Sequence, residues 1–484
     1  MTKKTNDRNS SPHVAILGAG PAGVGAAYYL TRQNRAKVTV LELNNGVGGN
    51  SGSFEHSGIF LDYGSHRLHP ACDPEIFKDI KMMLGEDLLV RPRHGRIRLK
   101  QRWIHFPLNP LDLVLRLPIG FGSGVAKDTV LSVISPLRTN GKDSPTFASV
   151  LEKQLGKTIC QEFYFPYARK IWGLPPEEIS AIQAQKRVSA NSIFKIIKKV
   201  FSKPQNTGVN GKPFFYYPRK GFGQISTEYF HHAQEYGATF HFGARVKQLN
   251  IEGDCIRSVI YETENQQQKV TADYIWSTLP LTVLIKSISP PPPRAILDAV
   301  ESIRFRSMIL IYLFLKTNQF TEYDAHYFPG EDIAITRLSE PKNYSGVKEP
   351  TGLTALCAEL PCNLNDELWK KSDHELGELL VEALEKAGLP VRVPIEEVFT
   401  RRLPFAYPIY DRGFEGHFEV LHQYLKRFTN LLSFGRQGLF VHDNTHHALY
   451  MARSAVDCLG EDGIFHQDKW QEYLKIFETH VVED

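Results

Sequence analysis

The chain has 484 residues, with 57 Lys and Arg against 53 Asp and Glu and a formal net charge of +4. A charge this small does not predict a nucleic-acid partner, and the length predicts two domains. Six scattered cysteines without a C-x-x-C pair argue against zinc and disulfides and favour a cytoplasmic protein. No signal-peptide-like start and no run of about eighteen apolar residues is present, so we expect no transmembrane helix. Residues 1–11 are predicted to be a disordered tail.

A glycine-rich turn follows this tail in the stretch "VAILGAGPAGVGAAYYL". The apolar run 14–17 predicts a buried strand, 21–33 a helix lined with small residues, and 37–41 a second strand. The G-x-G-x-x-G spacing is weak alone, but between a strand and a helix it favours a dinucleotide-binding turn over a chance glycine-rich loop.

Each residue of this turn has a physical role. Gly18 permits the tight turn, Gly20 lets the backbone approach a pyrophosphate, and Gly23 lets the helix pack close to the strand. The helix begins at Pro21 and Ala22, and its N-terminus faces the phosphates. Glu42 ends the second strand about twenty residues on, where an acid can bind the ribose hydroxyls.

The middle of the chain changes character after residue 90. Arg96, Arg98, Lys100 and Arg102 alternate with other residues, which predicts one strand with its basic side chains on one face. We interpret that face as solvated, although it could also meet an anionic substrate or lipid headgroups. Charges interrupt the apolar stretch 110–137, which favours a helix pair in a substrate domain over contact with a membrane surface.

Later segments predict a return to the first domain. Residues 214–225 lead into a helix, 237–249 form a strand pair, and 269–281 contain a further strand. The proline-rich stretch "SISPPPPR" predicts a rigid linker. Residues 429–459 predict a closing strand, loop and small-residue helix.

The order of these motifs resembles a known superfamily. The first turn, the "GGN" after Glu42, "GSHRLH", "ITRLSEPKNYS", "LPFAYPIYDRG" and "FGRQGLF" are collinear with the amine oxidase, protoporphyrinogen oxidase and UDP-galactopyranose mutase superfamily of FAD enzymes. The resemblance implies an α/β fold, with a Rossmann-like FAD-binding domain and an interleaved mixed α+β substrate domain. It implies FAD-domain segments at 12–90, 210–285 and 426–484, and substrate-domain segments at 91–209 and 286–425.

The resemblance also implies which residues contact FAD. The doublet Gly48-Gly49 would approach the diphosphate on its flavin side, and the G-R loop at Gly435 would approach the flavin ring. Asn444 could instead serve only as a helix N-cap. The implied FAD-binding set is Gly18, Gly20, Pro21, Ala22, Gly23, Glu42, Leu43, Gly48, Gly49, Asn50, Gly64, Ser65, His66, Val246, Gly435, Arg436 and Asn444.

Three residues are implied for catalysis or substrate binding. His66 would lie near the flavin, where an imidazole can exchange a proton, or it would be a structural histidine bonded to backbone. Arg337 would bind a substrate diphosphate, or it would pair with Glu340 or Glu359. Tyr407 would contact the diphosphate, or it would be a buried core tyrosine.

The terminal loop departs from the mutases, because Phe440, His442, Asn444 and His446 stand where they carry tyrosines and acids. We therefore favour an oxidoreductase that transfers hydride from a small organic substrate to FAD. The alternative is a redox-neutral nucleotide-sugar mutase using reduced FAD, and a non-catalytic FAD-stabilised scaffold is a third reading. The substrate could be anionic or a nucleotide sugar. No metal, no nucleic acid and no separate NAD domain are expected.

Overall fold

The computed structural model describes residues 11–106, 116–134, 144–187 and 213–482. The predicted tail at 1–11 lies almost wholly outside these residues, as does the expected boundary at 209–210. Of the segment 110–137, the described part is the helix α4 (Ile119–Ile134). In the described chain, no helix is both long and apolar enough to cross a membrane.

A five-stranded parallel sheet carries the glycine turn. Its strand order is β20-β13-β1-β2-β9, so β1 lies in the middle with β2 and β13 as neighbours. The five strands come from distant parts of the chain, which confirms the predicted Rossmann-like α/β fold. Their bounds are β1 (His13–Leu17), β2 (Lys37–Leu41), β9 (Thr239–His241), β13 (Tyr274–Ser277) and β20 (Leu431–Ser433).

Alternation along β1 sends side chains into two separate cores. Val14 and Ile16 pack on one face of the sheet, whereas Ala15 and Leu17 pack on the other. The first face is covered by α1 (Pro21–Arg32), α10 (Gln224–Glu235) and α18 (Thr445–Asp457). The second is covered by α11 (Leu281–Lys286), α12 (Arg294–Ser302), α16 (Phe414–Lys426) and a four-stranded sheet, β12-β11-β10-β14. The four strands are β10 (Arg245–Glu252), β11 (Cys255–Thr263), β12 (Gln266–Val270) and β14 (Ile288–Ser289).

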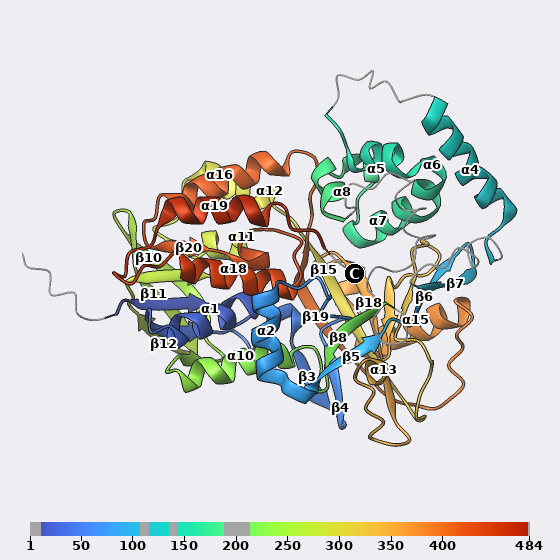
Figure 1. Cartoon of the computed structure of the whole chain (residues 1–484), viewed down its shortest axis with the longest axis horizontal. Helices are drawn as coiled ribbons and strands as arrows, with labels where there is room; N and C mark the ends of the chain where they lie inside the picture. The colour runs from blue at the N-terminus through green and yellow to red at the C-terminus, as the bar shows by residue number, and fades with distance from the viewer. Residues whose placement is uncertain (1–10, 107–115, 135–143, 188–212, 483–484) are drawn as a thin grey trace, which may run out of the picture.

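A second large sheet has seven strands in the order β19-β15-β18-β17-β16-β6-β7. It lies beside the parallel-sheet part of the molecule, with α15 (Asp373–Lys386) packed on it (Figure 1). Its core strand β15 is buried almost throughout. The strands are β6 (Gly95–Leu99), β7 (Arg102–Phe106), β15 (Phe305–Leu315), β16 (Ala325–Tyr327), β17 (Arg337–Ser339), β18 (Thr354–Cys362) and β19 (Ile395–Pro408).

Smaller elements complete the described chain. A helical cluster, seen at the upper right of Figure 1, packs around Phe147 and Trp172. It contains α5 (Phe147–Leu155), α6 (Lys157–Ile159), α7 (Phe165–Trp172) and α8 (Ala181–Arg187). Two short sheets pair β3 (Ser53–His56) with β4 (Ile59–Asp62) and β5 (Leu88–Pro92) with β8 (Phe214–Pro218). The remaining helices are α2 (Pro74–Leu84), α13 (Pro341–Ser345), α14 (Glu367–Lys370), α17 (Gly435–Gly438) and α19 (Gln467–Phe477). The predicted domain boundaries stay a prediction.

The prediction of one basic strand over residues 96–102 is wrong. The segment is a hairpin, in which β6 and β7 pair antiparallel and Lys100 and Gln101 turn the chain with positive φ angles of 52° and 59°. The basic side chains also do not share one solvated face, because Arg98 is buried and donates to Asp332 at 2.6 Å. A period of two cannot reveal a tight turn whose residues continue the alternation.

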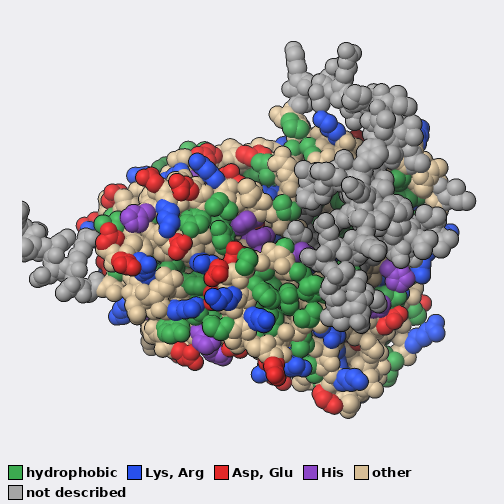
Figure 2. Space-filling view, viewed as in Figure 1, with side chains coloured by type: hydrophobic (Ala, Val, Ile, Leu, Met, Phe, Trp, Pro, Cys, Tyr) green, Lys and Arg blue, Asp and Glu red, His purple; other side chains and the backbone are tan. Residues whose placement is uncertain are grey.

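The surface carries charges of both signs. On the face in Figure 2, the described Lys and Arg side chains are intermingled with Asp and Glu. This mixing agrees with the small net charge of +4.

Candidate flavin and substrate site

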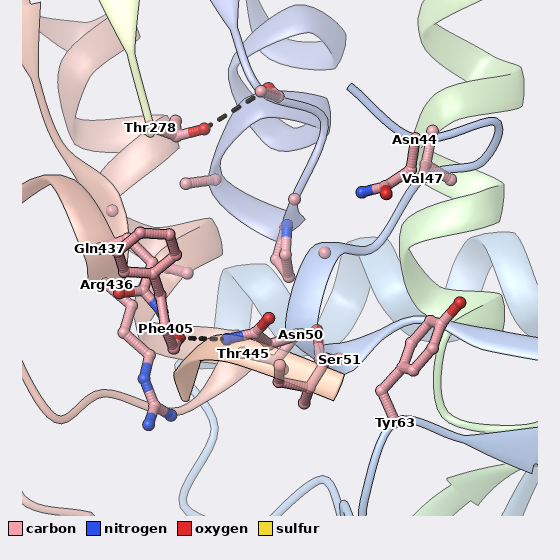
Figure 3. Close-up of a pocket in the computed structure, with 18 of the residues that line it drawn as sticks. Asn44, Val47, Asn50, Ser51, Tyr63, Thr278, Phe405, Arg436, Gln437 and Thr445 are labelled. Atoms are coloured by element: carbon pink, nitrogen blue, oxygen red, sulfur yellow. Dashed lines mark hydrogen bonds between the residues drawn. The ribbon is translucent and has the colours of Figure 1, made fainter. Parts of the chain in front are cut away.

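A large cavity opens at the carboxyl edge of the parallel sheet. It has a volume of about 1070 Å³, at the upper end of the range for small-molecule sites. Its walls come from the glycine turn, the loop after β2, the β3–β4 region, the end of β13, strand β19 and the loop before α18. Figure 3 shows part of this lining, with side chains from these separate segments facing a shared space.

The glycine turn has the geometry of a phosphate-binding cradle. Gly18 has φ +99°, and a Cβ there would lie 2.5 Å from Thr278 Oγ1. A Cβ on Gly23 would lie 1.9 Å from the carbonyl oxygen of Gly18, so only glycine allows the helix to sit this close. Gly20 lines the cavity, and a Cβ on it would meet no protein atom within 4 Å. The space over Gly20 at the N-terminus of α1 is thus open to an anionic ligand.

Glu42 is fixed by three hydrogen bonds. Its Oε2 accepts the Ala19 N–H at 2.7 Å, and its Oε1 accepts both the backbone and side-chain N–H of Asn44 at 2.8 Å. The residue is buried and lines the cavity. A carboxylate has about four acceptor positions, so this one retains capacity for a hydroxyl group.

Asn50 links the loop after β2 to the seven-stranded sheet. Its side-chain N–H donates to the carbonyl of Phe405 on β19 at 2.8 Å, the contact drawn in Figure 3. Gln437 of α17 donates to the same carbonyl at 2.7 Å. One backbone oxygen therefore joins three walls of the cavity.

The G-R loop lies directly against the first helix. Gly435 has φ +79°, and a Cβ on it would lie 2.8 Å from the Cβ of Ala22. Arg436 donates to the carbonyls of Asp443 and Ala406, both at 3.0 Å. Asn444 is the N-cap residue of α18 and also lines the cavity, so its capping role leaves it in position to meet a bound cofactor, which stays a prediction.

His66 faces the cavity and stacks on Phe222, with ring centroids 5.4 Å apart. Its Nε2 lies 2.9 Å from the carbonyl of Tyr63 and 3.1 Å from that of Asn50. Because carbonyls only accept, Nε2 carries the proton and Nδ1 keeps its lone pair. Burial lowers the pKa of His66, although the carboxyl of Asp62 acts against this shift. The ring is therefore neutral.

Arg337 is paired with Glu359. Its Nε and Nη2 donate to the two carboxylate oxygens at 2.9 Å each, and both side chains are largely buried. Glu359 Oε1 also accepts the Ser65 N–H at 2.8 Å. Of the two pairings that the sequence allowed, Glu359 is the partner. Glu340 bonds instead to the backbone N–H of Phe320 and to Thr354, among others.

The cavity does not gather every predicted residue. It is lined by Gly18, Gly20, Pro21, Ala22, Glu42, Leu43, Gly49, Asn50, Ser65, His66, Val246, Arg337, Gly435, Arg436 and Asn444. Gly23, Gly48, Gly64 and Tyr407 lie outside the lining. Tyr407 packs beneath Arg436, whose guanidinium carbon is 5.3 Å from the ring centroid.

Sequence reasoning missed several lining residues. Thr278 follows β13 and donates to the carbonyl of Leu17 at 3.0 Å, which ties two neighbouring strand ends together. A polar residue after a buried strand is the signal that could have found it. Arginines are more conspicuous, because seven line the cavity against the two acids Glu42 and Asp443. They are Arg67, Arg93, Arg245, Arg337, Arg401, Arg402 and Arg436.

A parallel sheet with a glycine turn at its carboxyl edge, opening on a large cavity, defines a dinucleotide-binding protein. Residues 21–443, most of the chain, match the family of flavin-containing amine oxidoreductases. The chain belongs to this family. It is a flavoenzyme, and its cofactor is FAD, as predicted.

Known proteins resemble the chain at different levels. Chloroplastic/mitochondrial protoporphyrinogen oxidase 2 of Arabidopsis thaliana is 34% identical over 113 residues, which cover 22% of this chain and 21% of that protein. The crystal structure of a reduced UDP-galactopyranose mutase superimposes with a TM-score of 0.75 and 22% identity, covering 92% and 93% of the two chains. Cyclohexylamine oxidase from Brevibacterium oxydans superimposes with a TM-score of 0.63 and 15% identity, covering 92% of this chain and 98% of that chain. These likenesses between structures establish the fold alone.

The residues present suit FAD. The cavity is large, Gly20 leaves room over the start of α1, and Glu42 retains acceptor capacity beside it. The Asn50–Phe405–Gln437 contacts form a second wall farther along the cavity.

Proposed function

We propose that the protein is an FAD-dependent oxidoreductase that removes a hydride from a small, anionic organic substrate. The observation that carries the anionic character is the arginine-rich cavity lining. Arg67, Arg337 and Arg402 have carboxylate partners outside the lining, and the other four arginines still outnumber its two acids. A cleft with one sign of charge concentrates ligands of the opposite sign.

The state of Arg337 supports an oxidoreductase over a nucleotide-sugar mutase. A mutase of this superfamily would use this arginine to hold a substrate diphosphate. Here Arg337 forms its bidentate hydrogen bonds with Glu359 instead, and Tyr407 lies outside the cavity lining. Releasing Arg337 would leave a buried carboxylate without its cation, which costs several kcal/mol.

The remaining residues would bind and orient. We infer that Gly20 and the N-terminus of α1 hold the diphosphate, and that Glu42 holds the adenosine ribose. His66 would offer Nδ1 as a proton acceptor to the substrate, since its Nε2–H is engaged by backbone carbonyls. FAD held by these residues would supply the hydride acceptor, with oxygen or another compound as the final electron acceptor.

Ligand binding to oxygen-free protein separates the two reactions. The FAD-loaded protein is reduced, then titrated with UDP and UDP-galactose while the flavin absorbance is recorded. We expect no binding of either ligand, and we expect a panel of small organic acids to include a substrate that bleaches the oxidised flavin. Binding of both nucleotides, with turnover only after reduction, would establish the mutase. A flavin spectrum that no compound alters would favour the scaffold.

Arg337→Ala gives a second, independent result. It leaves Glu359 buried and unpaired, so we expect a loss of about 3–5 kcal/mol in the free energy of unfolding. The double variant Arg337→Met/Glu359→Gln should regain most of it, because neither charge is then left buried and the Gln side chain can still accept the Ser65 N–H. Urea unfolding measures both. If Arg337→Ala leaves stability unchanged but weakens UDP-galactose binding about a hundredfold, the arginine serves substrate and the oxidoreductase proposal fails.

A further inference from the structure

A cluster of donor atoms lies beside the cofactor cavity, where the end of the chain meets the start of α18. It consists of Asp443, His447 and His480, whose ligand-type atoms all lie within 4.8 Å of one another. His480 Nδ1 is 2.8 Å from Asp443 Oδ2, and His447 Nδ1 is 3.9 Å from Asp443 Oδ1. The aspartate side chain is fully buried, and the two histidines are 10–14% exposed.

Two acceptor atoms of this cluster, His447 Nδ1 and Asp443 Oδ1, lie 3.9 Å apart without a proton between them. His447 Nδ1 accepts the backbone N–H of Asn444 at 3.2 Å, so it carries no proton of its own. Asp443 Oδ1 is buried and has no hydrogen-bond donor among the described residues. A buried carboxylate oxygen left in this state is costly. The spot between these atoms is therefore electron-rich and suited to a cation.

The chain end is held so that His480 stays in place. Lys186 of α8 donates from its ammonium to the carbonyls of Phe477, Glu478 and His480, at 3.4, 2.6 and 3.3 Å. The N–H of Val482 returns a bond to the carbonyl of Lys186 at 3.2 Å. These four contacts fix the segment after α19.

The two histidine rings are also fixed relative to each other. They stack with centroids 4.2 Å apart and an interplanar angle of 14°.

We propose that Asp443, His447 and His480 bind a divalent transition-metal ion of the Zn²⁺ type. Two imidazoles and a carboxylate are a ligand set that zinc takes in proteins. Metal–ligand bonds of about 2.1 Å place tetrahedral donors about 3.4 Å apart, and the observed separations of 2.8 and 3.9 Å bracket this value. Metal binding would replace the bond from Asn444 to His447 and the hydrogen bond between His480 and Asp443, and the Nδ1 proton of His480 would be released or move to Nε2.

Direct metal binding tests this site. The FAD-loaded protein is stripped with EDTA and titrated with Zn²⁺ against a chelating indicator. We expect one Zn²⁺ per chain, and we expect Asp443→Asn and His480→Ala each to weaken binding by roughly a hundredfold or more, since even outer-shell changes cost 10- to 100-fold. The matched control His417→Ala, which removes an exposed histidine, should bind like the wild type. Failure of the wild type to bind one equivalent, or equal binding by all variants, would overturn the proposal.

A second measurement does not depend on whether the variants fold. Crystals of the wild type soaked in Zn²⁺ are measured at the zinc absorption edge, and the anomalous peak locates the ion. A peak between Asp443, His447 and His480 supports the site. A peak at other surface histidines only, or none, overturns it. Flavin content and thermal unfolding of each variant show whether a loss of binding is specific.

Discussion

At the scale of single residues, Gly20 and Gly23 belong to one motif but meet opposite surroundings. The backbone of Gly20 is extended, with φ −68° and ψ 178°, so any residue can adopt it, and the space before it is open. Gly23 lies inside the contact between α1 and β1, where the carbonyl of Gly18 occupies the position of a side chain. Substitution by alanine should therefore weaken ligand binding at Gly20 and destabilise the fold at Gly23.

We predict that Gly20→Ala leaves the stability of the FAD-free protein within about 0.5 kcal/mol of the wild type, yet weakens FAD at least tenfold by filling the cradle. Gly23→Ala should lower the free energy of unfolding by about 1–3 kcal/mol or more, through overpacking. Urea unfolding without FAD and FAD titration by fluorescence give the two quantities. Equal effects of both substitutions on stability would show that this distinction is wrong.

The parts of the site that depend on short-range spacing could be predicted from the sequence. The parts that depend on how distant strands and helices pair could not. Gly18 and Glu42 follow from a spacing within thirty residues. The partner of Arg337 could not be chosen, because it depends on β17 lying antiparallel to β18, which sets Arg337 opposite Glu359. The proximity of Asp443 and His480 could not be predicted from the sequence either, because it depends on α19 folding back along α18.

At the scale of elements, β16 brings a histidine into the interior of the seven-stranded sheet. His326 is fully buried, with Trp103 at 5.5 Å and Tyr323 at 5.6 Å between ring centroids. Burial lowers the pKa of His326 to about 3, and the positive charge of Arg96 adds to this shift, although a backbone bond to Leu338 opposes it. The strand therefore tolerates the imidazole only in its neutral form.

This state predicts a pH dependence of stability. Between pH 6.5 and about 3 the unfolded chain binds a proton at His326 that the folded chain does not, so stability falls as the pH drops through this window. From pH 7 to pH 5 the contribution lost is about 2 kcal/mol, at 1.36 kcal/mol per pH unit. His326→Phe should remove this part of the slope in urea unfolding at the two pH values. The exposed-site control His417→Phe should keep it, and an unchanged slope in His326→Phe would contradict the assignment.

The order of elements was easier to predict than their pairing. The helix predicted at 21–33 ends at Arg32, and the strand predicted at 37–41 has exactly those bounds in the fold. The hairpin over residues 95–106 was missed, because its turn continues the alternation of the strands it joins. Hydrophobic period indicates which face is buried, but it does not mark where a chain reverses.

At the scale of the whole molecule, the cavity is assembled from segments spread between residues 18 and 448. A ligand that fills it contacts the parallel sheet, the β3–β4 region and β19 at once. Binding therefore stabilises the folded arrangement of all these parts together, and not one of them alone.

We predict that FAD at about 100 times its Kd adds about 2.7 kcal/mol to the free energy of unfolding. For a chain of 484 residues that unfolds as one unit, this corresponds to a rise in Tm of about 3 °C, at about 2.1 cal/mol/K per residue. Scanning calorimetry with and without FAD measures the shift, and Gly20→Ala at the same FAD concentration serves as the control. Two transitions, of which FAD moves only one, would show that the segments do not unfold together.

The carbonyl of Phe405, which receives both Asn50 and Gln437, has a consequence for how the enzyme can diverge. The oxygen belongs to the main chain, so no ordinary substitution at position 405 removes it, although a new side chain there would lose the contact of the ring with Phe305, 5.2 Å away between centroids. The two amides that reach it are side chains from different walls, so loss of one releases that wall while the other stays joined to β19. A wall anchored in this way can exchange the groups it presents to a ligand without losing its position.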